Sequence, residues 1–83
     1  MDTANLIHAD LTGANLRGAN LIGASLRGAE LWKAQFFGAN LKDADLKWAE
    51  LQGRELHGAK LHGTTLPDGS LEQQEVEFWS IHP

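Results

Sequence analysis

Residues 4–68 read ANLIH ADLTG ANLRG ANLIG ASLRG AELWK AQFFG ANLKD ADLKW AELQG RELHG AKLHG TTLPD when they are divided into fives. The third residue is Leu in twelve of these thirteen units and Phe36 in the other, and the first residue is Ala in eleven. Gly fills the fifth position in eight units. This regularity predicts a repeat architecture, with a lead of residues 1–3, a repeat body of 4–68 and a tail or cap of 69–83.

A period of five fits neither a helix nor a continuous strand. On an α-helix five residues advance by about 140° beyond a full turn, so the leucines would spiral around it. On one long strand an odd spacing would send successive leucines to opposite faces. The pattern is satisfied if the chain turns a corner in every unit. The first and third residues then point the same way on a short extended segment, and the last two form the bend. Gly suits the end of such a bend because it tolerates positive φ.

The phrase A-(N/D)-L-x-G, as in residues 14–18 and 19–23, resembles that of the pentapeptide-repeat family, and the resemblance covers residues 4–68. It implies an all-β fold, a right-handed quadrilateral parallel β-helix (a solenoid) with four units in each coil. The leading Ala and the central Leu or Phe would both face inward, and thirteen units would make about three coils. A collagen-like or low-complexity chain is not expected, because the large apolar residue recurs without a gap.

Four units per coil place residues twenty apart above one another, in four inward ladders that form the core. The ladders are Leu6, Leu26, Leu46 and Leu66; Leu11, Leu31 and Leu51, with Leu71 as a possible extension; Leu16, Phe36 and Leu56; and Leu21, Leu41 and Leu61.

Arg54 departs from the pattern, because it stands where Ala should point inward. We expect a local distortion that lets the guanidinium reach solvent. The alternative is an irregularity placed for a partner.

Both ends of such a coil need covering, since they expose backbone and apolar side chains. At the C-terminal end, residues 67–69 form a turn signal and residues 70–73 fit a capping box. We therefore predict a short helix over 71–80, or failing that an extended lid over the last coil. Three residues before Ala4 are too few for a cap, so we expect a second chain, or a missing domain, to cover the first coil.

The chain has 42% apolar residues, no Cys and a net charge of −4. The repeat body carries seven acids and seven bases, so the excess lies in Asp2 and in Glu72, Glu75 and Glu77. A neutral body does not favour direct nucleic-acid binding. Without Cys there are no disulfides or thiolate metal sites. No apolar run approaches the roughly 20 residues of a membrane helix, and no signal peptide is evident. We therefore expect a soluble cytoplasmic protein that does not enter the membrane.

The outward positions show no catalytic constellation. Asp10, Glu30 and Glu50 stack on one face but have no partner base, which indicates a solvated acidic stripe. His57 and His62 lie on adjacent faces and do not converge on a metal. Asn at the second position of a unit can bond neighbouring backbone, which is a structural role. We expect no enzyme activity, no cofactor, no metal and no small-molecule substrate.

Large apolar residues also fall at outward positions, and they form the predicted partner-binding surface. It comprises Trp32, Phe37, Arg27, Lys33 and Trp48. Aromatic residues and Arg are enriched in protein interfaces. The alternative is that these are ordinary single exposed hydrophobes, some of them covered by the tail.

The sequence therefore predicts a non-enzymatic structural or protein–protein interaction module. It would bind a protein partner, or form a homo-oligomer through its uncapped N-terminal end. The family resemblance implies an alternative, a DNA mimic that binds a topoisomerase such as gyrase. Those proteins resemble long acidic rods, whereas this chain is short and has a neutral body. A third possibility is an accessory domain of a larger protein.

Overall fold

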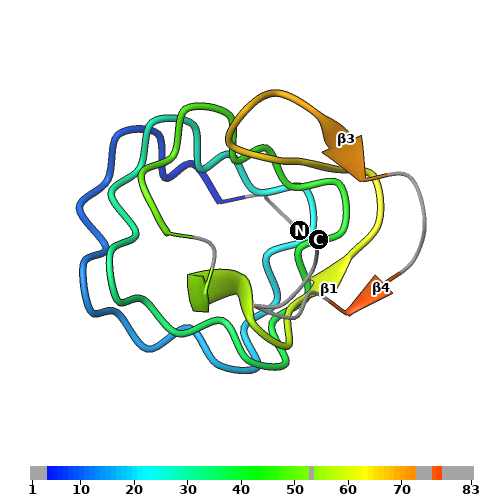
Figure 1. The fold of residues 1–83 in the computed structure, drawn as a ribbon, viewed down its shortest axis with the longest axis horizontal. Helices are drawn as coiled ribbons and strands as arrows, with labels where there is room; N and C mark the ends of the chain where they lie inside the picture. Colours follow the sequence, from blue (N-terminus) through cyan, green and yellow to red (C-terminus); the bar gives the residue numbers. More distant parts are fainter. Residues whose placement is uncertain (1–3, 53, 73–75, 78–83) are drawn as a thin grey trace.

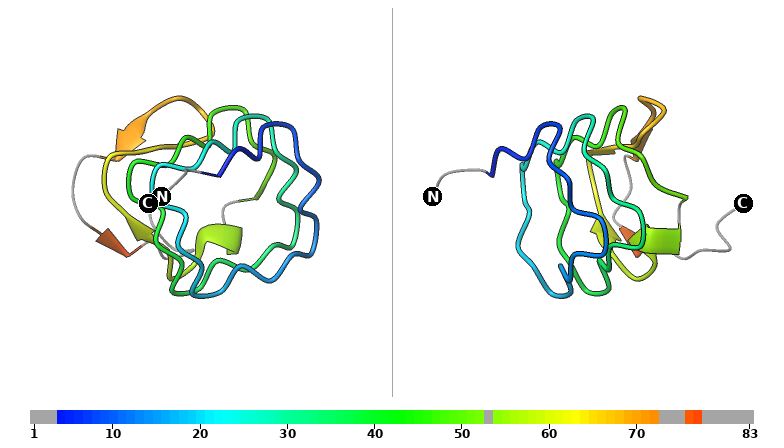
Figure 2. Two further views of the ribbon diagram at one scale, coloured as in Figure 1. Left: turned by 180° about the vertical axis from the view of Figure 1, so that it is seen from behind. Right: turned by 90° about the vertical axis from the view of Figure 1, so that its left-hand side faces the viewer.

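The structure, a computed structural model, describes residues 4–52, 54–72 and 76–77. The chain winds as a four-sided coil, and the right-hand view of Figure 2 shows its turns lying side by side along one axis. The named elements lie in the last third of the chain. They are the 3₁₀ turn η1 (Arg54–Leu56) and the strands β1 (Lys60–Leu61), β2 (Thr64–Thr65), β3 (Leu71–Glu72) and β4 (Val76–Glu77).

Parallel backbone bridges hold the coils together, and each joins residues twenty apart. The longest series runs through Asn5, Ser25, Asp45 and Thr65. At each bridge two hydrogen bonds alternate in direction: Ser25 N donates to Ala4 O at 2.9 Å, and Leu6 N donates to Ser25 O at 2.7 Å. A repeat distance of twenty residues places four five-residue units between stacked positions.

Most of the described corners are tight turns closed by a backbone bond, as where Ala9 N donates to Leu6 O at 3.0 Å. Among the units whose fifth residue the structure describes, that residue has positive φ in all but the last, which ends at Asp68. A type II turn requires positive φ of its third residue. The second residue supports the turn when it is Asn or Asp. Asp45 Oδ1, for example, accepts a bond of 3.0 Å from Lys47 N. This bond satisfies a corner N–H, and it explains the preference for Asn and Asp at this position.

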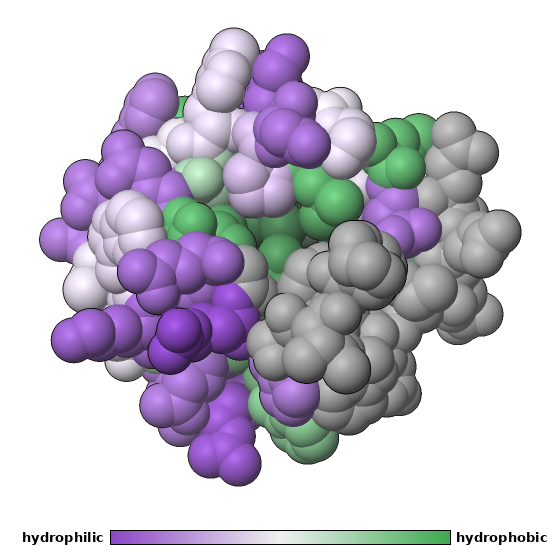
Figure 3. Space-filling model, viewed as in Figure 1, coloured by the Kyte–Doolittle hydropathy of each residue, from purple (hydrophilic) through white to green (hydrophobic). Residues whose placement is uncertain are grey.

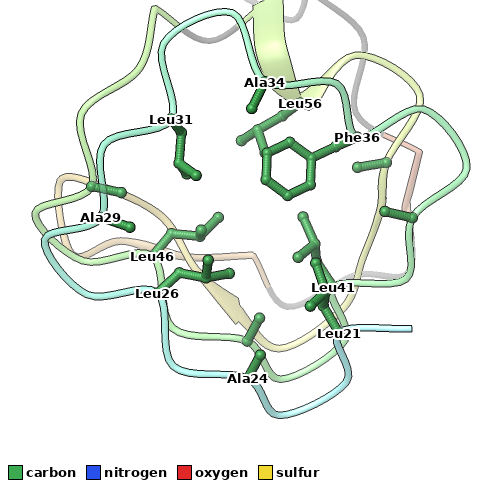
Figure 4. Packing of buried hydrophobic residues seen from close by; sticks show 14 of the residues in the cluster. Leu21, Ala24, Leu26, Ala29, Leu31, Ala34, Phe36, Leu41, Leu46 and Leu56 are labelled. Carbon is green, nitrogen blue, oxygen red and sulfur yellow. The ribbon is translucent and has the colours of Figure 1, made fainter. Parts of the chain in front are cut away.

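The inward ladders form the core, and Figure 4 shows their side chains converging from all four walls. Burial is complete in the middle of the coil and incomplete at its ends. The completely buried members with zero exposure are Leu26, Leu31, Phe36, Leu41 and Leu46. The members that are only partly buried but packed against the core are Leu6, Leu11, Leu16, Leu51 and Leu66.

At the C-terminal end the chain folds back as extended segments that pair with the last coil (Figure 1). Strand β3 pairs antiparallel with β2, with Thr65 opposite Leu71, and β4 pairs antiparallel with β1. The helix expected over 71–80 is therefore wrong at 71–72 and 76–77, and the remainder of that range lies outside the described residues. The extended alternative fits the described ones.

The reason lies in Ser70, whose hydroxyl donates to Asp68 Oδ1 at 2.6 Å instead of capping a helix. The last coil also offers unpaired strand edges, which an extended segment can satisfy. Leu71 does not extend a ladder either, because it lies on β3 with 52% of its surface exposed.

Candidate functional site

The described residues contain no group of three His, Asp or Glu side chains that could hold a metal ion. The acids Asp10, Glu30 and Glu50 do stack, through parallel bridges on one face. The Thr12 hydroxyl, and then the Thr12 N–H, lower the pKa of Asp10, so this carboxyl stays charged at neutral pH. All three residues of the stripe are exposed to solvent, and the more informative surface lies at the corners.

One corner presents Trp48 in contact with two cations, and we call Arg27, Lys47 and Trp48 the Trp48 corner. The Arg27 guanidinium carbon lies 4.9 Å from the centre of the indole ring, and Lys47 Nζ lies 4.8 Å from it. Arg27 Nε is 3.0 Å from Asp45 Oδ2, an ion pair without hydrogen-bond geometry. The indole remains 62% exposed.

Trp48 adopts a backbone conformation that its side chain disfavours. Its φ is +67°, and the residue twenty positions earlier is Gly28. A left-handed conformation costs an L-residue roughly 1–2 kcal/mol, and a bulky residue there is unusual. The two cation–π contacts return roughly 0.5–1 kcal/mol each at an exposed site. The contacts of Trp48 therefore add little net stability to the fold, although the indole is held in an outward position.

Trp32 lies at the corner that follows Arg27 along the chain. Its indole N–H forms a hydrogen bond within the molecule. Its Nε1 donates to Glu50 Oε1 at 3.4 Å, and 38% of the residue is exposed. Lys33 beside it also has positive φ, and its backbone N–H bonds Glu55.

Phe37 is 52% exposed and stacks on His57, with the ring centres 6.2 Å apart. Its ring also covers Gly58, where an added Cβ would overlap it. The predicted partner-binding residues therefore have separate surroundings. The structure brings Arg27 to Trp48, while Trp32 and Phe37 contact Glu50 and His57 instead.

Glu55 was not among the predicted site residues. It is only 5% exposed, although it stands at an outward position of its unit. Glu55 Oε1 accepts from Gln52 N at 2.9 Å and Oε2 accepts from Lys33 N at 3.1 Å. Arg54 was the feature of the sequence that could have indicated this burial. A unit whose first residue cannot fit in the core must change its backbone path, and its second residue is displaced with it. Arg54 itself is exposed, as the expected distortion requires.

The displaced unit borders a cleft of about 280 Å³. Its walls come from both sides of the distortion: Arg17, Ala34, Gln35, Phe36, Phe37, Arg54, Glu55 and His57.

Residues 4–43 and 39–73 match the family model for pentapeptide repeats, with eight copies. The chain belongs to the pentapeptide-repeat family. Proteins of this family are generally structural or interaction modules, and the family is known for non-catalytic repeat proteins.

Two solved structures are similar to this pentapeptide-repeat chain. A pentapeptide-repeat protein of the Arabidopsis thaliana thylakoid lumen is 32% identical, with a TM-score of 0.46 and coverage of 87% of this chain and 54% of that one. HetL of the cyanobacterium Nostoc sp. strain PCC 7120, involved in regulating heterocyst differentiation, is 28% identical, with a TM-score of 0.26 and coverage of 86% and 59%. The chain thus spans little more than half the length of these proteins. A search of curated protein sequences found no match. Within the described residues no helix is long and apolar enough to cross a membrane.

Proposed function

We propose that this chain is a rigid, non-enzymatic module that binds a protein partner through the Trp48 corner. The observation that carries the proposal is the +67° φ of Trp48, at a position that is Gly in eight of the thirteen units. Strained residues persist where the surrounding structure enforces them, and they gather at sites of function.

The chemistry of the corner suits a protein interface. Trp and Arg are the side chains that most often dominate binding energy when they are buried by a partner. Here the indole and the Arg27 guanidinium are already in contact, which reduces the side-chain freedom lost on binding.

Self-association through the N-terminal end is the finer part of the proposal. Leu6, Leu11 and Leu16 are only partly buried, whereas Leu26, Leu31 and Phe36 in the next coil are completely buried. A second copy placed against the first coil would cover the part of these three leucines that remains accessible. The proposal also includes a right-handed coil, about three turns and an extended C-terminal cap. Family membership supports the right-handed sense, the thirteen units support the number of turns, and the pairing of β3 and β4 with the last coil supports the cap.

The experiment compares Trp48→Gly with wild type in chemical cross-linking and affinity purification from cells that express the chain. We expect Trp48→Gly to keep the circular dichroism spectrum of the wild type and to lose the partner. The matched control is the double change Trp32→Ala and Phe37→Ala, which should leave recovery of the partner unchanged. Full recovery with Trp48→Gly would contradict the proposal, and loss with the control alone would move the interface to Trp32 and Phe37.

A further inference from the structure

The sequence contains one Asp–Gly step, Asp68–Gly69, and it lies in the turn that leads from β2 into β3 (Figure 1). An aspartyl residue isomerises most readily before Gly, because Gly has no side chain to hinder attack by its own nitrogen on the preceding carboxyl. The other four aspartates precede Thr, Leu or Ala. Residues 68–70 are all exposed, so water reaches the turn. Asp68 is therefore the aspartate at which isomerisation is chemically favoured.

The reaction rearranges the main chain without changing its mass. The Gly69 nitrogen attacks Cγ of the neutral Asp68 carboxyl: a C–N bond forms, the C–OH bond breaks, and the hydroxyl leaves as water with the N–H proton. The product is a five-membered succinimide, to which water then adds. Opening at Cγ restores Asp, whereas opening at the α-carbonyl leaves Gly69 linked through Cγ as isoaspartate. The main chain of the isoaspartyl form is longer by one carbon.

The folded turn engages the groups that this reaction needs. Gly69 N donates to Leu66 O at 2.8 Å, so the proton of the attacking nitrogen is held. Asp68 Oδ1 accepts the Ser70 hydroxyl at 2.6 Å and Ser70 N at 2.9 Å. The hydroxyl, and then the N–H, lower the pKa of Asp68 and so favour the carboxylate over the neutral acid. A carboxylate does not release its oxygen as water, so the intact turn opposes succinimide formation.

The same turn sets the register of the C-terminal cap. Leu66 N donates to Ser70 O at 2.7 Å, and directly beyond this bond Thr65 of β2 stands opposite Leu71 of β3. The register of a hairpin is fixed by the length and type of its turn. One additional main-chain carbon after Asp68 lengthens the turn, so Ser70 can no longer meet Leu66 while β3 keeps its register with β2.

We propose that Asp68 is a site of isoaspartate formation that the C-terminal cap controls. The turn blocks the reaction while β3 is paired with β2, and isoaspartate at this position keeps β3 from pairing again. Opening of one such segment requires less free energy than global unfolding, so the reaction proceeds from the locally opened cap. The inference rests on the contacts of the turn and does not depend on the Trp48 corner.

The test follows isoaspartate in the full chain at neutral pH, folded in buffer or unfolded in guanidinium chloride. Trypsin releases residues 61–83 as one peptide, in which Asp68 is the only Asp and Asn is absent. Chromatography separates the isoaspartyl form of this peptide, and electron-transfer fragmentation identifies it. We expect formation to be at least tenfold faster in the unfolded chain, because unfolding removes both hydrogen bonds to the charged carboxylate. Equal rates in the two states would overturn the proposal.

Three variants separate the turn from the rest of the fold. Ser70→Ala should raise the rate in the folded chain about tenfold, as for loss of one hydrogen bond to a charged group. Ser70→Thr retains a hydroxyl and should keep the slow rate of the wild type. Ser25→Ala removes a hydroxyl outside the turn and should also keep it, whereas all the unfolded chains should react at similar rates. A folded Ser70→Ala chain that reacts no faster than Ser25→Ala would overturn the proposal.

The purified isoaspartyl chain tests the effect on the cap. Amide hydrogen exchange should show lost protection at Leu66, whose N–H bonds Ser70 O in the intact turn. Protection should be retained at Leu41, whose N–H bonds Lys60 O within the coil. Wild-type protection at Leu66 would show that β3 still pairs, and loss at both residues would show that the whole coil opens. Either result would overturn the control of the cap by Asp68.

Discussion

At the scale of single residues, the fifth position of the unit shows how one dihedral angle limits the sequence. His8, Lys33, Asp43 and Trp48 have positive φ without being Gly. The side chains of His8 and Asp43 also pack against a Gly of the next coil. A Cβ added at Gly28 would lie 2.5 Å from the His8 ring, and one added at Gly63 would overlap the Asp43 carboxyl. Gly is therefore needed at these sites both for its φ and for the space it leaves.

The strain at Trp48 can be measured by comparing two variants that lose the same contacts. Trp48→Ala and Trp48→Gly both remove the indole, but only Gly adopts a φ of +67° without cost. We expect Trp48→Gly to be more stable than Trp48→Ala by about 1 kcal/mol, less than the full strain because Gly also loses more entropy on folding. Urea unfolding provides the measurement. Equal stabilities would show that the corner is not strained, and would remove the support for the proposed interface.

Glu55 is the residue whose loss should cost most outside the apolar core. Glu55→Ala leaves the N–H groups of Lys33 and Gln52 without their acceptor, at about 1–1.5 kcal/mol each, so we expect a loss of roughly 2–3 kcal/mol. Glu55→Gln keeps one acceptor oxygen and should lose about half as much. Unfolding free energies of the two variants check this order. A loss below 0.5 kcal/mol for Glu55→Ala, of the order of ordinary surface changes, would show that water replaces the carboxylate.

At the scale of elements, the turn before β3 combines one carboxyl with two donors. Asp68 Oδ1 accepts from the Ser70 hydroxyl at 2.6 Å and from Ser70 N at 2.9 Å. The hydroxyl, and then the N–H, lower the pKa of Asp68 below 3.8. Since the folded pKa lies below the unfolded one, the charged carboxyl stabilises the fold above about pH 4, and this contribution is lost as pH falls through the folded pKa.

Asp68→Asn keeps an acceptor oxygen but cannot titrate, so it isolates this effect. We expect wild type to be the more stable protein at pH 7, and the difference between the two to shrink as pH falls from 4.5 to 2.5. Urea midpoints across this range measure the difference. Ser70→Ala removes the hydroxyl and should reduce the pH dependence in the same direction. A difference that stays constant with pH would show that Ser70 does not hold the charged form.

The same turn shows what the sequence could and could not predict. Ladders, corners and the outward position of Arg54 follow from a local pattern repeated thirteen times, so each position is determined by its own unit. The helix expected over 71–80 is wrong at 71–72 and 76–77, the part of that range that the structure describes, because Ser70 has two possible partners. The choice between them depends on strand edges that exist only after the coil forms. Glu55 and the cleft depend similarly on the path that the backbone takes once Arg54 is excluded from the core.

At the scale of the whole molecule, the two ends of the coil differ. Figure 3 looks onto the C-terminal end and shows apolar side chains in a hollow near its centre, with polar groups along part of the rim. At the C-terminal end β3 and β4 pair with the last coil. At the N-terminal end the first coil contributes only partly buried leucines. Because each coil contacts only its neighbours, the stability of a terminal coil depends on what covers it.

Leu46 and Leu11 test this dependence, since Leu46 is completely buried and Leu11 partly buried. We expect Leu46→Ala to cost about 3 kcal/mol at any protein concentration, as for other buried leucines. Leu11→Ala should cost only about 1 kcal/mol in dilute solution, because less of its surface leaves water on folding.

If a second copy covers the first coil, the wild type gains stability from assembly as concentration rises, and Leu11→Ala gains less. The cost of Leu11→Ala should then grow between micromolar and millimolar protein, while that of Leu46→Ala stays constant. Thermal unfolding over this range, with sedimentation equilibrium on the same samples, provides both measurements. A wild-type chain that sediments as a monomer throughout, with a Tm independent of concentration, would contradict self-association through this end and leave the Trp48 corner as the proposed route to a partner.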